Sequence, residues 1–171
     1  MKKYIYILSL LVISLSACKK EEPIGGTAVQ DMSGEWWVQI DGAGDYYKVV
    51  TSNTADNSNT KMWVDLTGFW GTDVPPAQLV KARVDVNTAD KTFSITNVDN
   101  VQDSGYGEPG DPPIKITVKN GKVITDGAIG PVSKQKTDAI SLEVSFSDDQ
   151  NPGTIYKLVG YHRTKFPDDD H

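Results

Sequence analysis

Few residues in this chain have the types and spacing that enzyme chemistry needs. The sequence contains two histidines, His162 and His171, and a single cysteine, Cys18. Nucleophilic catalysis requires a serine or thiol beside a base and an orienting group. The motif DSGYG around Ser104 lacks the first glycine of a G-x-S-x-G nucleophile elbow, and its surroundings do not predict a strand followed by a helix. We therefore expect no catalytic residues and no hydrolase activity.

The sequence also lacks a pattern for a metal or a cofactor. Its histidines and cysteine do not have the spacing of a zinc site. The Asn-rich segment 51–59 lacks the twelve-residue pattern of a calcium loop and its terminal glutamate. We interpret this segment as a solvated turn, and we expect no bound metal and no cofactor.

The position of Cys18 indicates a different kind of chemistry. It follows two lysines, a short apolar run at 4–15 and the small residues Ser16 and Ala17, which is the pattern of a secretory signal. The apolar run is shorter than the roughly 20 residues that span a bilayer. The sequence LSAC resembles the bacterial lipobox, which implies cleavage before Cys18 and acylation of its sulfur. We therefore predict a signal peptide at 1–17 and membrane attachment through lipidated Cys18, since two or more acyl chains anchor a protein stably.

The segment after Cys18 has the composition of a flexible tether and resembles an export signal. Residues 18–32 are polar and contain glycine, so we expect a flexible tether before a single domain at 33–171. In Bacteroides-type lipoproteins, a lysine and acidic residues after the lipidated cysteine resemble an export signal, and CKKEE approximates it with one extra lysine. This resemblance implies an outer-membrane, surface-exposed protein, whereas a solvated linker is the alternative.

The net charge of −6 argues against a nucleic-acid partner, because phosphates require clustered lysine and arginine.

The domain shows the period-two alternation of half-buried strands. AISLEVSFS at 139–147 places Ile140, Leu142, Val144 and Phe146 on one face. Similar alternation occurs at 61–67, 80–87, 91–98 and 114–125, and further strands are expected at 36–40, 46–52 and 155–161. Asn120-Gly121 is the sequence of a two-residue type I′ turn, so we expect a hairpin within 114–125. The Gly- and Pro-rich segment 104–113 is expected to be a surface loop.

These strands predict an all-β fold, either a barrel or a sandwich built as an antiparallel meander. One short motif favours the barrel. Lipocalins, avidins and related calycins carry Gly-x-Trp in the first strand, with a basic residue of the last strand over the indole. Gly34, Trp36 and Arg163 match this pattern. We therefore expect a lipocalin-like barrel of about eight strands, closed by the Arg163 cation over the Trp36 ring.

Longer stretches resemble one family. They are GTAVQDMSGEWWVQIDGAGDYYKVV, KMWVDL with the following GFW, SFSDD with PGT, and the terminal GYHRTKFPDDDH. They resemble Bacteroides-type surface lipoproteins described as "lipid-binding putative hydrolase", over residues 26–171. The resemblance implies a small lipocalin-like barrel and an association with SusC/SusD-type outer-membrane importers.

Aromatic side chains are the candidates for a binding or interface surface: Trp37, Tyr46, Trp63, Phe69 and Trp70. Neighbouring Trp36 and Trp37 must face opposite sides of a strand, so Trp37 points outward if Trp36 is inside. Outward aromatics are typical of partner surfaces, although packing under a loop explains them equally well.

Two hypotheses follow for the function. The first is a non-catalytic accessory or binding subunit of a SusC/SusD-like nutrient importer, which predicts a barrel filled by its own side chains. The second is a lipid or small-ligand binding protein, which predicts an open cavity of roughly 300 Å³ or more in the barrel mouth. The family context favours the first.

Overall fold

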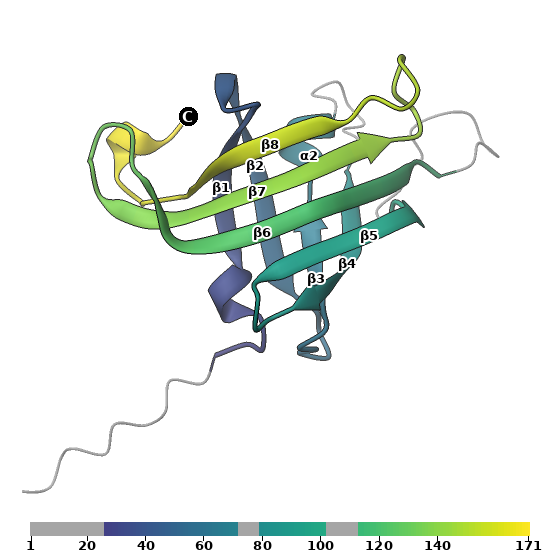
Figure 1. The fold of residues 1–171 in the computed structure, drawn as a ribbon, viewed down its shortest axis with the longest axis horizontal. Coiled ribbons are helices and arrows are strands. Elements are labelled where there is room, and N and C mark those ends of the chain that lie inside the picture. Colours follow the sequence, from purple (N-terminus) through teal and green to yellow (C-terminus); the bar gives the residue numbers. More distant parts are fainter. Residues whose placement is uncertain (1–25, 72–78, 102–112) are drawn as a thin grey trace, which may run out of the picture.

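The computed structural model describes residues 26–71, 79–101 and 113–171, and they form a closed, eight-stranded antiparallel barrel (Figure 1). Each strand pairs with its neighbours in the sequence, and β1 pairs with β8 to close the barrel. The strands are β1 (Gly34–Ile40), β2 (Ala43–Asn53), β3 (Lys61–Asp65), β4 (Lys81–Asn87), β5 (Thr92–Asp99), β6 (Lys115–Ile129), β7 (Lys136–Phe146) and β8 (Tyr156–His162). The predicted all-β meander barrel is therefore confirmed. No helix in the described ranges is long and apolar enough to cross a membrane.

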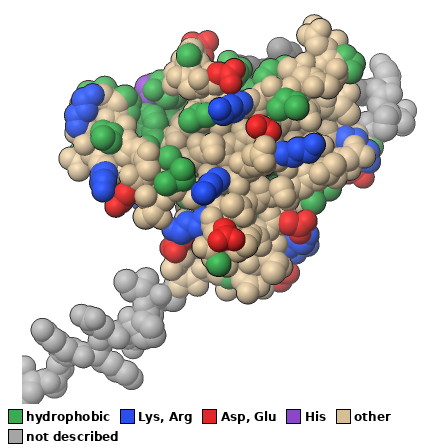
Figure 2. All heavy atoms as spheres, in the orientation of Figure 1, with side chains coloured by type: hydrophobic (Ala, Val, Ile, Leu, Met, Phe, Trp, Pro, Cys, Tyr) green, Lys and Arg blue, Asp and Glu red, His purple; other side chains and the backbone are tan. Residues whose placement is uncertain are grey.

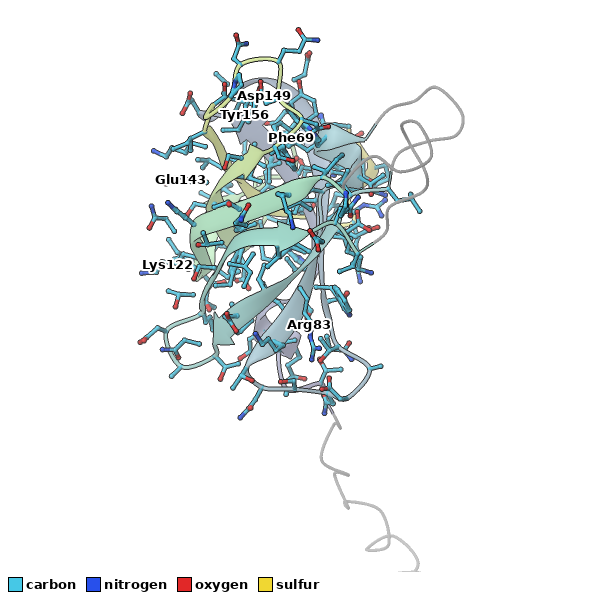
Figure 3. The ribbon with its side chains drawn as sticks, turned by 90° about the vertical axis from the view of Figure 1, so that its right-hand side faces the viewer. Phe69, Arg83, Lys122, Glu143, Asp149 and Tyr156 are labelled. Atoms are coloured by element: carbon cyan, nitrogen blue, oxygen red, sulfur yellow. The ribbon has the colours of Figure 1, made fainter. Side chains whose placement is uncertain are left out.

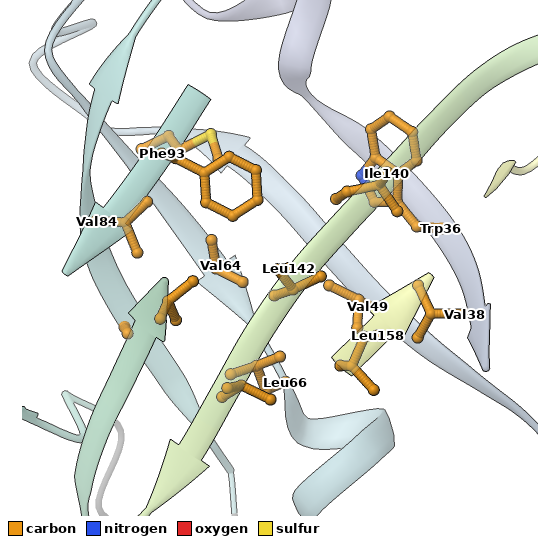
Figure 4. Packing of buried hydrophobic residues seen from close by; sticks show 14 of the residues in the cluster. Trp36, Val38, Val49, Val64, Leu66, Val84, Phe93, Ile140, Leu142 and Leu158 are labelled. Carbon is orange, nitrogen blue, oxygen red and sulfur yellow. The ribbon is translucent and has the colours of Figure 1, made fainter. Parts of the chain in front are cut away.

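The barrel interior is a packed hydrophobic core. The predicted inward face of β7 is confirmed, because Ile140, Leu142, Val144 and Phe146 are all buried. The core continues with Met62, Val64 and Leu66, one of the two alternating sets in the segment 61–67. Figure 4 shows Phe93 and Val64 on one side of Leu142 and Trp36 on the other. Burying each such side chain stabilises the fold by about 1.5–3 kcal/mol relative to leaving it exposed. Together these residues fill the barrel interior.

The predicted hairpin at Asn120-Gly121 is wrong, because β6 runs through it as one long strand. The pairing with β7 moves from Lys119 opposite Glu143 to Lys122 opposite Ser141, so two residues of β6 face Leu142 alone. This arrangement is a β-bulge, which bends and twists the strand. Asn120 takes a positive φ of 51°, which asparagine tolerates better than most residues.

A single helical turn replaces the end of the strand predicted at 61–67. β3 ends at Asp65, whose carboxylate accepts a hydrogen bond from the Thr67 amide at 3.0 Å, and α2 (Thr67–Trp70) follows. Gly68 lets α2 lie directly on β2, since a Cβ there would be 2.4 Å from the Lys48 carbonyl oxygen. The turn brings its aromatic residues over one end of the barrel.

Residues before the predicted boundary at residue 33 also pack against the barrel. Val29 immediately precedes the 3₁₀ turn η1 (Gln30–Met32), Met32 is its last residue, and both are buried in the core. The Met32 carbonyl accepts a hydrogen bond from the Thr51 hydroxyl at 2.6 Å. The last residues of the predicted tether 18–32 therefore belong to the barrel. Cys18 and Ser104 lie outside the described residues, as does almost all of the predicted loop 104–113.

Candidate functional site

Gly34 and Trp36 meet at the predicted barrel-closing corner, but Arg163 does not cover the indole. The Trp36 indole N–H donates to the Thr51 hydroxyl at 2.8 Å, and the edge-on ring beside it is His162, 4.9 Å away between centroids. Gly34 is required here, because a Cβ would lie 2.1 Å from His162 Nε2.

Arg163 instead binds two carboxylates. Its guanidinium donates to Glu35 at 2.7 Å and makes a two-pronged contact with Asp170. Charge-assisted bonds of this kind are stronger than a cation over a ring face. The two ion pairs therefore explain why the predicted contact with Trp36 does not form.

Two of the predicted interface residues, Trp37 and Tyr46, lie under the C-terminal end of the chain. His171 stacks on Tyr46 at 3.6 Å between centroids and meets Trp37 edge-on. The Trp37 indole N–H donates to Asp170, and this bond together with Arg163 lowers the pKa of Asp170 to about 2. We call Trp37, Tyr46, Tyr161 and His171 the C-terminal cluster.

Asp169 fastens the same end to the hairpin between β6 and β7. One carboxylate oxygen accepts hydrogen bonds from the amides of Val132 and Ser133, and the other accepts bonds from the hydroxyls of Ser133 and Thr164. Burial alone would raise the pKa of Asp169, but these donors lower it overall. The sequence PDDDH therefore forms a docked segment, with η2 (Pro167–Asp169) at its centre.

Trp63 lies on the outer wall of the barrel, because it alternates with the buried residues Met62 and Val64. Its ring is partly buried, and the Lys81 ammonium lies 5.2 Å from the ring centroid. A cation at this distance covers the ring face. Trp63 is therefore separate from the other predicted aromatic residues.

The remaining predicted residues, Phe69 and Trp70, belong to a group of five rings that we call the barrel-end cluster. Trp70 stacks on Phe146 at 4.2 Å with an interplanar angle of 6°. Phe69 meets Tyr47 edge-on at 5.2 Å and Tyr156 at 5.4 Å. Aromatic pairs in these geometries contribute about 0.5–1.5 kcal/mol beyond the area that they bury. The cluster continues the core, since Phe146 is buried and the other four rings are partly exposed.

Two carboxylates orient the polar atoms of this cluster. The Trp70 indole N–H donates to Asp148 at 3.0 Å, and the Tyr156 hydroxyl donates to Asp149 at 2.7 Å. The bond to Asp149 raises the pKa of Tyr156, because it favours the protonated phenol. In Figure 3, Phe69, Asp149 and Tyr156 lie together at one end of the molecule, away from Arg83. Trp70 and Tyr156 are therefore held in place by their polar atoms, and their rings stay partly exposed.

Exposed aliphatic side chains lie near the barrel-end cluster. Leu79 is 42% exposed, and its neighbour Val80 is held to α2 through the Thr67 hydroxyl. Val101 is 51% exposed beside it, since its amide donates to the carbonyl of Lys81. Ile155 is 61% exposed and immediately precedes Tyr156. These residues give the aromatic end of the barrel an apolar rim.

The sequence identified only part of this site. Phe69 and Trp70 were candidates, but Tyr47, Phe146 and Tyr156 were not. Phe146 was placed on an inward strand face, and its position just before Ser147-Asp148-Asp149 was the available signal that this strand end is special. Only the closed meander shows that the ends of β7 and β8 meet α2.

The described residues do not form the open cavity that the ligand hypothesis predicted in the barrel mouth. The barrel interior is filled by the core, whereas a hollow of about 750 Å³ lies on the outer wall over β4, β5 and β6. On the face shown in Figure 2, basic and acidic side chains are interspersed. That face therefore has no extended field of one sign.

Both histidine side chains pack against other residues of the barrel. His162 packs against Trp36, and burial lowers its pKa. His171 Nε2 lies 2.9 Å from the Tyr161 hydroxyl and its ring is stacked on Tyr46. Across the described part of the chain, no three metal-ligating side chains gather into a cluster.

Comparison with known families identifies the chain. Residues 21–167 match the model of a family described as "lipid-binding putative hydrolase". The chain belongs to this family. The match spans every strand of the barrel and includes all five residues of the barrel-end cluster. No curated protein matches the chain significantly.

Proposed function

We propose that the protein is a non-catalytic lipid-binding protein that holds an acyl chain against the barrel-end cluster. The observation that carries this proposal is the partly exposed aromatic surface of Tyr47, Phe69, Trp70 and Tyr156, continuous with the core and edged by exposed aliphatic residues. Contiguous apolar patches that reach the surface often mark binding sites. The family description supports a lipid as the ligand.

The cluster suits an acyl chain more than a polar ligand. Asp148 and Asp149 already bind the indole N–H of Trp70 and the hydroxyl of Tyr156, so the rings offer mainly apolar faces. Each methylene that leaves water contributes about 0.8 kcal/mol. Affinity should therefore rise with the length of the chain until the surface is covered.

Binding is favoured over hydrolysis because the histidines have structural partners. His162 lies between Gly34 and Trp36, and His171 is held by Tyr46 and Tyr161. An esterase assay with p-nitrophenyl esters tests this part of the proposal. Turnover that is lost in His162→Ala would contradict it.

Membrane attachment through Cys18 and surface exposure remain predictions from the sequence. An association with a SusC/SusD-like importer likewise rests on resemblance alone. The filled barrel interior is what that hypothesis predicted, whereas the partly exposed aromatic surface and the family description support a lipid ligand bound outside the interior. Native pull-down from outer membranes with a tagged copy tests this association, and recovery of the protein alone would contradict it.

The experiment for lipid binding is a calorimetric titration of the full chain with laurate and palmitate. We expect saturable binding that is tighter for palmitate and at least tenfold weaker in Trp70→Ala. Trp63→Ala is the matched control, because it removes an indole from the outer wall, and it should bind as the wild type does. Equal weakening in both variants, or no dependence on chain length, would contradict the proposal.

A further inference from the structure

The hollow on the outer wall, which we call the wall groove, has a composition unlike that of the barrel-end cluster. It has a volume of about 750 Å³ and is bounded by outward residues of β4, β5 and β6. Its polar side chains include Lys119 and Lys122 of β6 and Ser94 and Thr96 of β5, and partly exposed Val86 of β4 contributes apolar surface. The groove therefore combines cations and hydroxyl groups with a small apolar area.

The bulge in β6 places both lysines on the same wall. In a regular strand, residues three apart point to opposite faces. Here Asn120-Gly121 adds one residue to β6, so Lys119 and Lys122 are both exposed while Val118 and Val123 are both buried. The groove depends on this irregularity in the strand.

Packing from β5 supports the bulge. Gly121 lies opposite Phe93, and a Cβ at Gly121 would be 2.4 Å from two carbons of the Phe93 ring. The next matched pair on these strands is Ile95 with Val118, so Ser94 lies opposite Lys119 and Asn120. Lys122 lies opposite Thr92, two residues before Ser94 on β5.

The polar groups of the groove are available to a ligand. Among the described residues, neither lysine of the groove makes an ion pair or side-chain hydrogen bond, and the hydroxyls of Ser94 and Thr96 have no protein partner either. Most lysines in the same ranges do have one, for example Lys115 with Asp99 and Lys136 with Asp126. Lys157 and Lys165 are also without a partner in the described structure, but they lie outside the groove.

The acidic groups near the groove are already engaged. Asp85 lines it but is paired with Lys61 on the neighbouring strand. Glu143, opposite Lys119, accepts a hydrogen bond from the Asn120 amide at 2.8 Å. In a chain with a net charge of −6, two unpaired lysines beside free hydroxyl groups form a local site for an anion.

We propose that the wall groove binds a phosphate-bearing polyol. Lys119 and Lys122 contact the phosphate, and the hydroxyls of Ser94 and Thr96 bind hydroxyl groups of the ligand. This chemistry is shared by glycerophospholipid headgroups and by free polyol phosphates. The proposal concerns a different surface from the barrel-end cluster and stands independently of acyl-chain binding.

The test uses the full chain and sn-glycerol 3-phosphate in a calorimetric titration at low ionic strength. We expect saturable 1:1 binding that weakens at least tenfold in the double variant Lys119→Ala/Lys122→Ala. The control variant Lys157→Ala/Lys165→Ala removes the same charge outside the groove and should change affinity less than twofold. Circular dichroism checks that both variants fold.

A second arm identifies the source of the ligand. If the groove takes a lipid headgroup, the chain should cosediment with phosphatidylglycerol vesicles more than with phosphatidylcholine vesicles, and the Lys119/Lys122 variant should lose this difference. If only the soluble phosphate binds, a free polyol phosphate is the ligand. Failure to bind either probe, or equal loss of binding in the control variant, would overturn the proposal.

Discussion

The contact between Gly121 and Phe93 should be sensitive to one added methyl group. In Gly121→Ala, the new Cβ would lie 2.4 Å from two Phe93 ring carbons and 2.5 Å from the Phe93 carbonyl oxygen. Carbon atoms pack at about 3.5–4.0 Å, so these neighbours must move by about 1 Å. The ring can turn, but the carbonyl belongs to β5, which is paired with β6 at this point.

Overpacking of a core usually costs about 1–3 kcal/mol. Because a backbone atom is involved, we expect Gly121→Ala to lose about 2–3 kcal/mol of the free energy of unfolding. For a chain of this size, that loss lowers the melting temperature by about 4–12 °C. Urea unfolding followed by circular dichroism measures it.

Two further variants separate the causes. Thr96→Ala changes an exposed residue of β5, the strand that contains Phe93. Its free energy of unfolding should stay within about 0.5 kcal/mol of the wild-type value. In a Phe93→Leu background, the cost of Gly121→Ala should decrease but not vanish, since the ring is gone and the carbonyl remains. A Gly121→Ala protein with an unchanged unfolding midpoint would refute the role of this contact in holding the bulge.

Other predictions concern the barrel-closing corner and the docked C-terminal segment. Gly34→Ala places a Cβ 2.1 Å from His162 Nε2 and should cost about 1–3 kcal/mol in urea unfolding; an unchanged midpoint would show that the ring moves freely. The pKa of Asp170 is lowered from 3.8 to about 2, so the stability that it contributes is present above pH 4 and is lost as the pH falls toward 2. Acid titration of Trp37 fluorescence measures this loss, which should be absent in Asp170→Asn. Burial lowers the pKa of His162 below 6.5, so folding stability should fall as the pH drops from 6.5, and a His162→Gln variant with the same pH dependence would contradict this.

The sequence predicted the fold class and most of the inward residues, but not the course of β6. Val118 and Val123 both face the core, and their odd spacing interrupts strict alternation. Either a hairpin or a bulge satisfies that spacing, and Asn-Gly suits both because each needs a positive φ. The bulge forms because β5 and β7 pair with β6 on both sides of it, which is information from distant parts of the chain.

The C-terminal segment was unpredictable for a similar reason. PDDDH has the composition of a solvated tail, yet Asp169 is buried against donors of Val132 and Ser133, more than thirty residues earlier. The same donors compensate the cost of burying its charge. Local composition alone contains no sign of them.

The sequence predicted only part of the candidate site. Phe69 and Trp70 were candidates because aromatic residues are enriched at partner surfaces. Their partners Tyr47, Phe146 and Tyr156 come from three strands, and only closure of the barrel brings them together. A set of residues that is assembled by topology requires the structure.

The most direct test of the central claim locates a bound acyl chain relative to the four tryptophans. Stearate with a nitroxide near its methyl end quenches only nearby indoles. We predict saturable quenching in the wild type that is retained in Trp63→Phe and largely lost in Trp70→Phe. Quenching that persists in Trp70→Phe would place the acyl chain away from the barrel-end cluster and contradict the account.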